Sequence, residues 1–459
     1  MFSKETYIAR RKKLAADVKS GVLLFLGNDE CGMNYKDNEY PYRQDSTFLY
    51  FFGLDYAGLN AIIDIDNGKE IIFGNDLTVD DIVWTGVQPS VQDNASKVGV
   101  ENTLPTCNLR KYLDKAKAQG RVIHFLNPYR GDHYLKIFEL LDIVPAAQKS
   151  LVSIDFIKAI VSQRIYKSKE EIVEIEKACS TTAQMHIKMM QMLAPGVSEM
   201  EVAAAVVEIA QRNGGRISFP NIATIHGQTL HQHNQTNIAK EGDLFLLDAG
   251  AESLMHYAGD QSSTCCVSKH FTERQKTIYN ICYNAHMAAV HALKPGIAFK
   301  EVHLIAATEI AKGMKELGIV KGDPREVAES GAYAMFFPCG LGHMMGLDVH
   351  DMENMGEVYV GYDGKPKSTQ FGFKSLRLAR PLEAGFVLTI EPGIYFIPKL
   401  IDQWRAENKF MEFINYDELN KWRNFGGLRN EEDYLITDSG YRRLGDYKPM
   451  TISEVEALR

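Results

Sequence analysis

The 459-residue sequence contains no apolar run long enough to cross a bilayer, and its first residues lack the apolar core of a signal peptide. It also contains no basic block, because 51 Lys and Arg are interspersed with 59 Asp and Glu, for a net charge of -8. A nucleic-acid-binding surface would need clustered positive charge. We therefore expect a cytoplasmic protein that binds neither membranes nor nucleic acid.

Cysteine is scarce. The seven cysteines are scattered and odd in number, which argues against a disulfide framework, so we expect them to be reduced. Cys265 and Cys266 are adjacent on a predicted strand, and a neighbouring pair does not have the spacing of a zinc knuckle. They are interpreted as buried packing residues.

The first part of the chain is predicted to be α/β. Residues 22–26 form a short apolar run that ends at Gly27, which indicates a buried strand. Residues 61–66 and 71–73 flank the turn Asn67-Gly68, which is typical of a hairpin. Residues 122–126 predict a further strand. Chain length allows two or three domains, and we place a boundary near residue 165, giving domains 1–165 and 166–459.

A long amphipathic helix is predicted to open the second domain. Ser168 is a suitable N-cap, and Glu171 three residues later completes a capping box. Ile172, Ile175 and the pair 178–179 then form one apolar stripe. The helix should therefore pack against a core on that side.

An internal repeat follows, with an offset of one hundred residues. Three features occur twice: a helix bearing Met and His, a Pro-Gly stop, and an acidic helix start. They are found at His186 and His286, at residues 193–196 and 293–296, and at Glu201 and Glu301. Three aligned features favour duplication. Two related halves would form a central sheet with a cleft in which ligands from both halves could meet.

Four acids and one histidine stand out in the second domain. Asp248 ends an apolar strand, Asp260 follows the antiparallel return, Glu391 ends another apolar strand, and Glu431 precedes one. His343 lies in the glycine-punctuated segment 342–351. For one buried acid, a salt bridge is as good an explanation as a metal. Four acids with an imidazole instead favour a site for two divalent metals, since isolated buried carboxylates are costly.

Such a ligand set suits Mn²⁺, Co²⁺ or Fe²⁺, with Zn²⁺ as a further candidate. Two metals about 3.5–4 Å apart can lower the pKa of a water and polarise a carbonyl. The chemistry indicated is metal-assisted hydrolysis.

The order Asp, Asp, His, Glu, Glu within these motifs resembles the pita-bread metallopeptidases, which include methionine aminopeptidase, aminopeptidase P and prolidase. Residues 375–377, 391–396 and 426–429 are most similar to prolidase, and residues 42–46 and 84–86 resemble the N-terminal domain of prolidase and aminopeptidase P. The resemblance covers nearly the whole chain. It implies an α/β (α+β) fold, with an N-terminal creatinase-type α/β domain and a duplicated pita-bread catalytic domain.

The resemblance implies that two metal ions, with Mn²⁺ as first choice, are held by Asp248, Asp260, His343, Glu391 and Glu431. Asp260 and Glu431 would include the bridging or bidentate ligands, and Glu391 would be both ligand and general base. Two features depart from the family: the spacing between the aspartates is one residue longer, and residues 261–264 replace an aliphatic residue and Thr. Glu432 is the alternative to Glu431, because the two acids are adjacent.

Further site residues are implied by the same motifs. His231 and His350 would be catalytic, and His350 would also contact substrate. Arg377 would bind the substrate's terminal carboxylate, although a solvated basic face is the commoner place for arginine. Arg429 would orient Glu431 from outside the ligand set.

The remaining assignments compete with ordinary structural roles. Tyr395 would line the substrate pocket or belong to the core. Trp84 would lie at the mouth of the site or pack on a domain surface. His233 could support the ligands or be exposed, and His226 is interpreted as structural or loop-lining.

The predicted function is Xaa-Pro dipeptidase, with aminopeptidase P acting on longer peptides as the alternative. A metal-free binding protein or a creatinase-like hydrolase of the same fold is disfavoured, because all five ligand positions are filled. The expected partners are Xaa-Pro di- or oligopeptides. Relatives are dimers or tetramers, so we expect a homodimer or homotetramer in which the N-terminal domain caps the site and mediates self-association.

Overall fold

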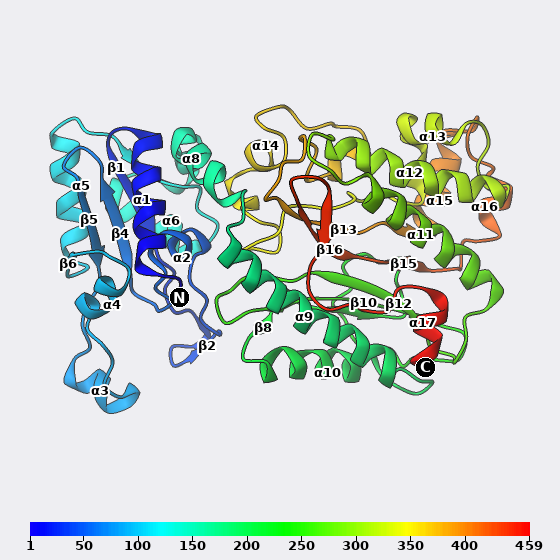
Figure 1. Ribbon diagram of the computed structural model, residues 1–459, viewed down its shortest axis with the longest axis horizontal. Helices are drawn as coiled ribbons and strands as arrows, with labels where there is room; N and C mark the ends of the chain where they lie inside the picture. Colours follow the sequence, from blue (N-terminus) through cyan, green and yellow to red (C-terminus); the bar gives the residue numbers. More distant parts are fainter. The chain divides into compact units, whose positions relative to one another are not determined.

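The computed structural model describes all 459 residues and divides the chain into two compact units (Figure 1). The first consists of Met1–Arg164 and Met352–Tyr359, and the second of Ile165–Asp351 and Val360–Arg459. None of the helices combines the length and apolar composition that crossing a bilayer requires. All seven cysteines are free thiols, and Cys265 and Cys266 are buried.

A mixed five-stranded sheet forms the centre of the first unit, in the order β6-β5-β4-β1-β7. The strands are β1 (Val22–Leu26), β4 (Asn60–Asp64), β5 (Lys69–Phe73), β6 (Asn102–Leu104) and β7 (Ile123–His124). The predicted hairpin is confirmed by the antiparallel pairing of β4 with β5. The predicted strand over 122–126 is shorter than expected. A small hairpin, β2 (Gly32–Tyr35) and β3 (Asn38–Glu39), stands apart from this sheet.

Helices cover both faces of this sheet. Val22 and Leu24 of β1 point into a core with Leu109 and Ile137, from α5 (Asn108–Ala118) and α6 (Gly131–Leu141). Phe25 points the other way and contacts aromatic rings of α2 (Ser46–Phe52) and α8 (Ile154–Arg164). The other helices of this unit are α1 (Lys4–Val18), α3 (Val79–Thr85), α4 (Val91–Lys97), α7 (Pro145–Leu151) and η2 (Glu353–Met355).

The second unit contains the repeated helix pairs. They are α9 (Lys169–Met192) with α10 (Glu199–Arg212), and α11 (Glu273–Ala292) with α12 (Phe299–Glu316). The predicted capping box of Ser168 and Glu171 is confirmed at the start of α9. Each pair turns at a glycine with positive φ, +98° at Gly196 and +88° at Gly296, which a side chain would strain. The two turns are therefore equivalent in conformation as well as in sequence.

Each helix pair covers strands of its own half. Helix α9 contacts β10 (Leu244–Ala249), β11 (Ala251–Glu252) and β12 (Gln261–Cys266), whereas α11 contacts β13 (Val387–Ile390), β14 (Gly393–Tyr395) and β15 (Gly427–Arg429). The sheets have the orders β12-β10-β9, β11-β8, β13-β16-β17 and β14-β15. Strand β15 contacts β10 and β12, which joins the two halves.

Short elements complete the second unit. They are β8 (Arg216–Ile217), β9 (Ile222–Thr224), α13 (Pro324–Ser330), η1 (Ala332–Met335), η3 (Phe373–Ser375), α15 (Pro398–Ala406), α16 (Tyr416–Asn420), β16 (Glu432–Ile436), β17 (Tyr441–Arg443) and α17 (Ile452–Ala457). Helix α14 (Glu357–Val360) begins in the segment assigned to the first unit and ends in the second.

Candidate metal centre

Two antiparallel strands place the aspartates on one side of a sheet. Asp248 is the penultimate residue of β10 and pairs with Ser262 of β12. Asp260 lies two residues before Ser262, and alternate residues of a strand point to the same face. The antiparallel return predicted from the sequence is thus confirmed, and it directs both carboxylates the same way.

The two glutamates come from the other half of the unit. Glu391 directly follows β13, and Glu431 lies between β15 and β16. Strands β13 and β16 are antiparallel, with Ile390 opposite Glu432. The backbone N–H of Glu431 donates to the carbonyl of Ser262 at 3.1 Å, which attaches this glutamate to the first half.

His343 lies in an irregular segment that runs beside β13. Its carbonyl accepts from Thr389 N–H at 3.0 Å, and its own N–H donates to the Thr389 hydroxyl at 3.2 Å. The ring Nδ1 lies 3.1 Å from the Met344 carbonyl, which can only accept, so Nδ1 carries the proton. The lone pair is then on Nε2, and this tautomer is the one that metal-binding histidines adopt when a carbonyl orients them.

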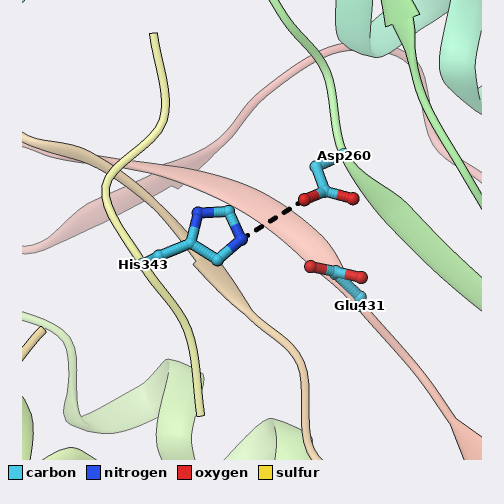
Figure 2. Close-up of side chains that lie close together, drawn as sticks. All are labelled: Asp260, His343 and Glu431. Atoms are coloured by element: carbon cyan, nitrogen blue, oxygen red, sulfur yellow. Dashed lines mark ion pairs between the residues drawn. The ribbon is translucent and has the colours of Figure 1, made fainter. Parts of the chain in front are cut away.

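Asp260, His343 and Glu431 converge from three separate segments of the chain (Figure 2). Their potential ligand atoms all lie within 4.8 Å of one another. His343 Nε2 is 3.3 Å from Asp260 Oδ2 and 3.6 Å from Glu391 Oε1. Four of the five predicted ligands are thus brought together by these distances.

This cluster brings several buried acids together with too little positive charge to balance them. Burial, and next the charge of Asp248, raises the pKa of Asp260 to about 7. Burial also raises the pKa of Glu391 and, with the charge of Asp260, that of Glu431 well above its ordinary value. Buried carboxylates at this separation need cations if they are to ionise together. Divalent metals therefore fit the donor set.

Arg429 is buried and holds the fifth predicted ligand. Its guanidinium donates to Asp248 at 2.6 Å, to the Ser262 hydroxyl at 2.8 Å and to the Tyr395 hydroxyl at 2.8 Å. The sequence predicted that Arg429 would orient Glu431. The structure differs, because the direct partner is Asp248 and Glu431 is reached only through Ser262.

Ser262 is a site residue that the sequence prediction did not identify. Its hydroxyl donates to Glu431 Oε2 at 2.8 Å while accepting from Arg429. The departure from the family over residues 261–264 therefore leaves a hydroxyl in contact with a predicted ligand. Strand alternation offered a signal, since Ser262 follows Asp260 by two residues and must share its face.

Three predicted substrate-contacting or catalytic residues lie near the cluster. The His350 ring stands 4.2 Å from that of His343, at an interplanar angle of 65°. Burial raises the pKa of Asp260 and of Glu391, and the positive charge of Arg377 offsets part of that rise, as expected of a guanidinium close to them. Reduced hydration, and next the charge of Arg429, lowers the pKa of His231.

The other predicted residues are placed differently. Tyr395 has no exposed surface, and its hydroxyl accepts from Arg429, so it supports that arginine and does not line an open pocket. Trp84 is 86% exposed on α3 of the first unit. His233 and His226 are both exposed, and the His233 ring is 6.4 Å from that of His231. The roles of Trp84, His233 and His226 stay predictions.

Comparison with known proteins identifies the family. The sequence model described as "Metallopeptidase family M24" matches residues 173–438, and that described as "Aminopeptidase P, N-terminal domain" matches residues 7–124. The chain belongs to metallopeptidase family M24. This membership confirms the predicted enzyme class and fold class, and a metallopeptidase family implies divalent metal ions.

Similar proteins in this family share nearly the whole length of the chain. An Xaa-Pro dipeptidase of Mus musculus is 29% identical, over 97% of this chain and 90% of that protein. A probable Xaa-Pro aminopeptidase of Fusarium vanettenii is 30% identical, over 92% and 88%. A zinc-substituted Escherichia coli aminopeptidase P in complex with product has a TM-score of 0.81 and 27% identity, over 100% and 98%. The similarity to these proteins therefore extends across both units of the chain.

Proposed function

We propose that this M24 member hydrolyses the peptide bond before proline, with an Xaa-Pro dipeptide as its preferred substrate. The observation that carries the proposal is the convergence of Asp260, His343 and Glu431 within 4.8 Å, since buried acids so close together need cations. The names of the similar proteins supply the bond specificity. Asp248 and Glu391 complete the proposed ligand set for two metals.

The chemistry that metals would supply here is polarisation of the scissile carbonyl and acidification of the attacking water. Glu391 is the proposed base. Its side chain is 20% exposed, against 6% for Asp260, so it is the more accessible to a water and substrate. Burial raises its pKa, which makes its carboxylate a stronger proton acceptor than an exposed glutamate.

Substrate binding is assigned to the cationic and imidazole groups beside the cluster. His350, next to His343, would donate to the oxygen that gains charge as the carbonyl carbon becomes tetrahedral. Arg377 would bind the free carboxylate that follows proline in a dipeptide, because a guanidinium matches a carboxylate bidentately. His231 would assist at the same site. Trp84 belongs to the first unit, whereas all the proposed ligands belong to the second.

Hydrolysis of Ala-Pro and Ala-Pro-Ala tests the proposal directly. Both peptides are assayed after metal stripping and after re-addition of Mn²⁺, which we propose as the working metal. Metal-dependent cleavage of the dipeptide alone is the expected result. Cleavage of the tripeptide as well would favour aminopeptidase P, the second candidate, which the similarity to the E. coli enzyme supports. Cleavage of neither would refute both.

Two finer expectations accompany this proposal. We propose that the protein is a homodimer or homotetramer, which light scattering of the purified chain would test. We also propose a cytoplasmic location, which cell fractionation would test. A monomer or a secreted protein would contradict them.

A further inference from the structure

Two fully buried histidines occupy equivalent positions in the internal repeat. His186 lies on α9 and His286 lies on α11, one hundred residues later, and neither side chain is exposed. The proposed hydrolysis uses neither of them. Each lies on the helix that covers the strands of its own half. Burying a polar imidazole there costs free energy unless it makes hydrogen bonds, so its contacts need an explanation.

Both histidines contact the backbone beside a proposed ligand. His186 Nε2 lies 3.1 Å from the carbonyl of Ala249, the residue after Asp248. His286 Nδ1 lies 3.3 Å from the carbonyl of Asn430, the residue before Glu431. The repeat thus places one imidazole against the Ala249–Gly250 peptide, one residue beyond Asp248, and the other against the peptide that joins Asn430 to Glu431.

These imidazoles are neutral and each has a defined tautomer. Burial, and next the charge of Lys448, lowers the pKa of both His186 and His286 to about 3. A carbonyl oxygen can only accept, so His186 carries its proton on Nε2 and His286 on Nδ1. The free Nε2 of His286 accepts from the Tyr434 hydroxyl at 2.9 Å, which fits this tautomer.

We propose that His186 and His286 are positioning residues for the metal centre, one for each half of the repeat. Fixing the Asn430 carbonyl fixes the peptide plane that carries the Glu431 N–H, and with it the direction in which the Glu431 side chain leaves the backbone. Fixing the Ala249 carbonyl holds the end of β10 one residue beyond Asp248, which constrains the Asp248 side chain through the strand. The inference rests on the proposed function, because it takes these two acids to be metal ligands.

Six variants separate positioning from packing. His186→Leu and His286→Leu keep bulk in the core but remove the N–H. His186→Gln puts an amide N–H near the former Nε2, whereas His286→Asn puts one near the former Nδ1. The exchanged amides, His186→Asn and His286→Gln, have the wrong length and should not restore the contact.

His303 provides a matched control. It is also fully buried, its pKa is also lowered to about 3 by burial, and its Nε2 lies 2.6 Å from the Tyr333 hydroxyl. That partner is not adjacent to any proposed ligand. His303→Leu should therefore cost stability without affecting metal binding.

The measurement is calorimetric titration of the metal-stripped full chain with MnCl₂ alone, with thermal unfolding as a fold check. We expect the two leucine variants at positions 186 and 286 to bind Mn²⁺ about tenfold more weakly or worse. The length-matched amides should recover most of the affinity, and His303→Leu should bind like the wild type.

Wild-type affinity in both leucine variants, or an equal loss in His303→Leu, would overturn the inference. If a leucine variant does not fold, the asparagine and glutamine variants at that position are compared with each other. Equal Mn²⁺ affinity in both overturns the inference, and a difference of about tenfold in favour of the length-matched amide supports it. A wild-type protein that takes up no Mn²⁺ would overturn the proposed function, and this inference with it. Two Mn²⁺ ions bound with the same affinity by the wild type and by every variant would overturn the inference alone.

Discussion

Replacing Asp260 by Asn should stabilise the metal-free protein while abolishing hydrolysis. Asp260 is buried, and its pKa is raised from 3.8 to about 7 by burial and by the charge of Asp248. The asparagine amide has nearly the same shape but no charge. The substitution thus removes the cost of ionising this group and also removes a proposed metal ligand.

The size of the effect follows from the pKa. A group whose folded-state pKa is raised contributes stability below its unfolded pKa, and this contribution is lost as the pH rises through the folded value. For Asp260 the loss falls between about pH 4 and pH 8 and amounts to about 4 kcal/mol, at about 1.4 kcal/mol per tenfold change. The asparagine side chain does not titrate in this range. The free energy of unfolding of the variant should therefore exceed that of the wild type by an amount that grows to about 4 kcal/mol as the pH rises.

Urea unfolding after dialysis against EDTA would measure this difference at pH 4, 6 and 8. Tryptophan fluorescence is a suitable signal, because Trp404 and Trp422 lie in the second unit and Trp404 is 2% exposed. Trp84 is already 86% exposed and should change little. With saturating Mn²⁺ the order should reverse at pH 8, since only the wild type gains from binding.

A variant of an exposed aspartate, Asp438→Asn, is the control and should show no pH-dependent advantage. If Asp260→Asn were less stable than the wild type at pH 8 without metal, or if its advantage were the same at every pH, the reasoning would be refuted. Normal hydrolysis by Asp260→Asn would refute the ligand assignment separately.

Three further substitutions test other parts of the site. His343→Ala should abolish Mn²⁺-dependent hydrolysis with little change in circular dichroism, and a full-rate variant would exclude it as a ligand. Arg429→Met should destabilise the protein by about 3 kcal/mol in urea, because it removes a buried guanidinium and leaves the partly buried Asp248 carboxylate without its partner. A loss under 1 kcal/mol would contradict the pairing. Arg377→Ala should raise KM for Ala-Pro by about tenfold or more but KM for Ala-Pro-Ala much less. The control Lys374→Ala, at an exposed neighbouring position, should change neither KM. Equal effects of Arg377→Ala on both peptides would exclude carboxylate binding.

The sequence allowed the framework of the second unit to be predicted, because local patterns encode it. Residues 168–171 determine the start of α9 locally, and the repeat required only a comparison of the chain with itself. Apolar runs that end in an acid identified the strand ends at Asp248 and Glu391. These signals are independent of which strands become neighbours.

What the sequence did not reveal depends on tertiary contacts. Arg429 donates to Asp248, which is 181 residues away, and nothing near either residue favours that pairing over one with Glu431. The segment Met352–Tyr359 belongs to the first unit, although it is short and has no periodicity of its own. Strand β7 contains only two residues, because only Ile123 and His124 pair with β1.

The distribution of the proposed ligands along the chain has a consequence for biosynthesis. Asp248 and Asp260 belong to the half that is made first, but Ser262 meets Glu431 across 169 residues. A nascent or prematurely terminated chain that lacks Glu431 can complete its early strands yet cannot assemble the full ligand set. The newly made protein would thus acquire its hydrolytic capacity only after Glu431 has been made, when the strands of the first half can already have folded.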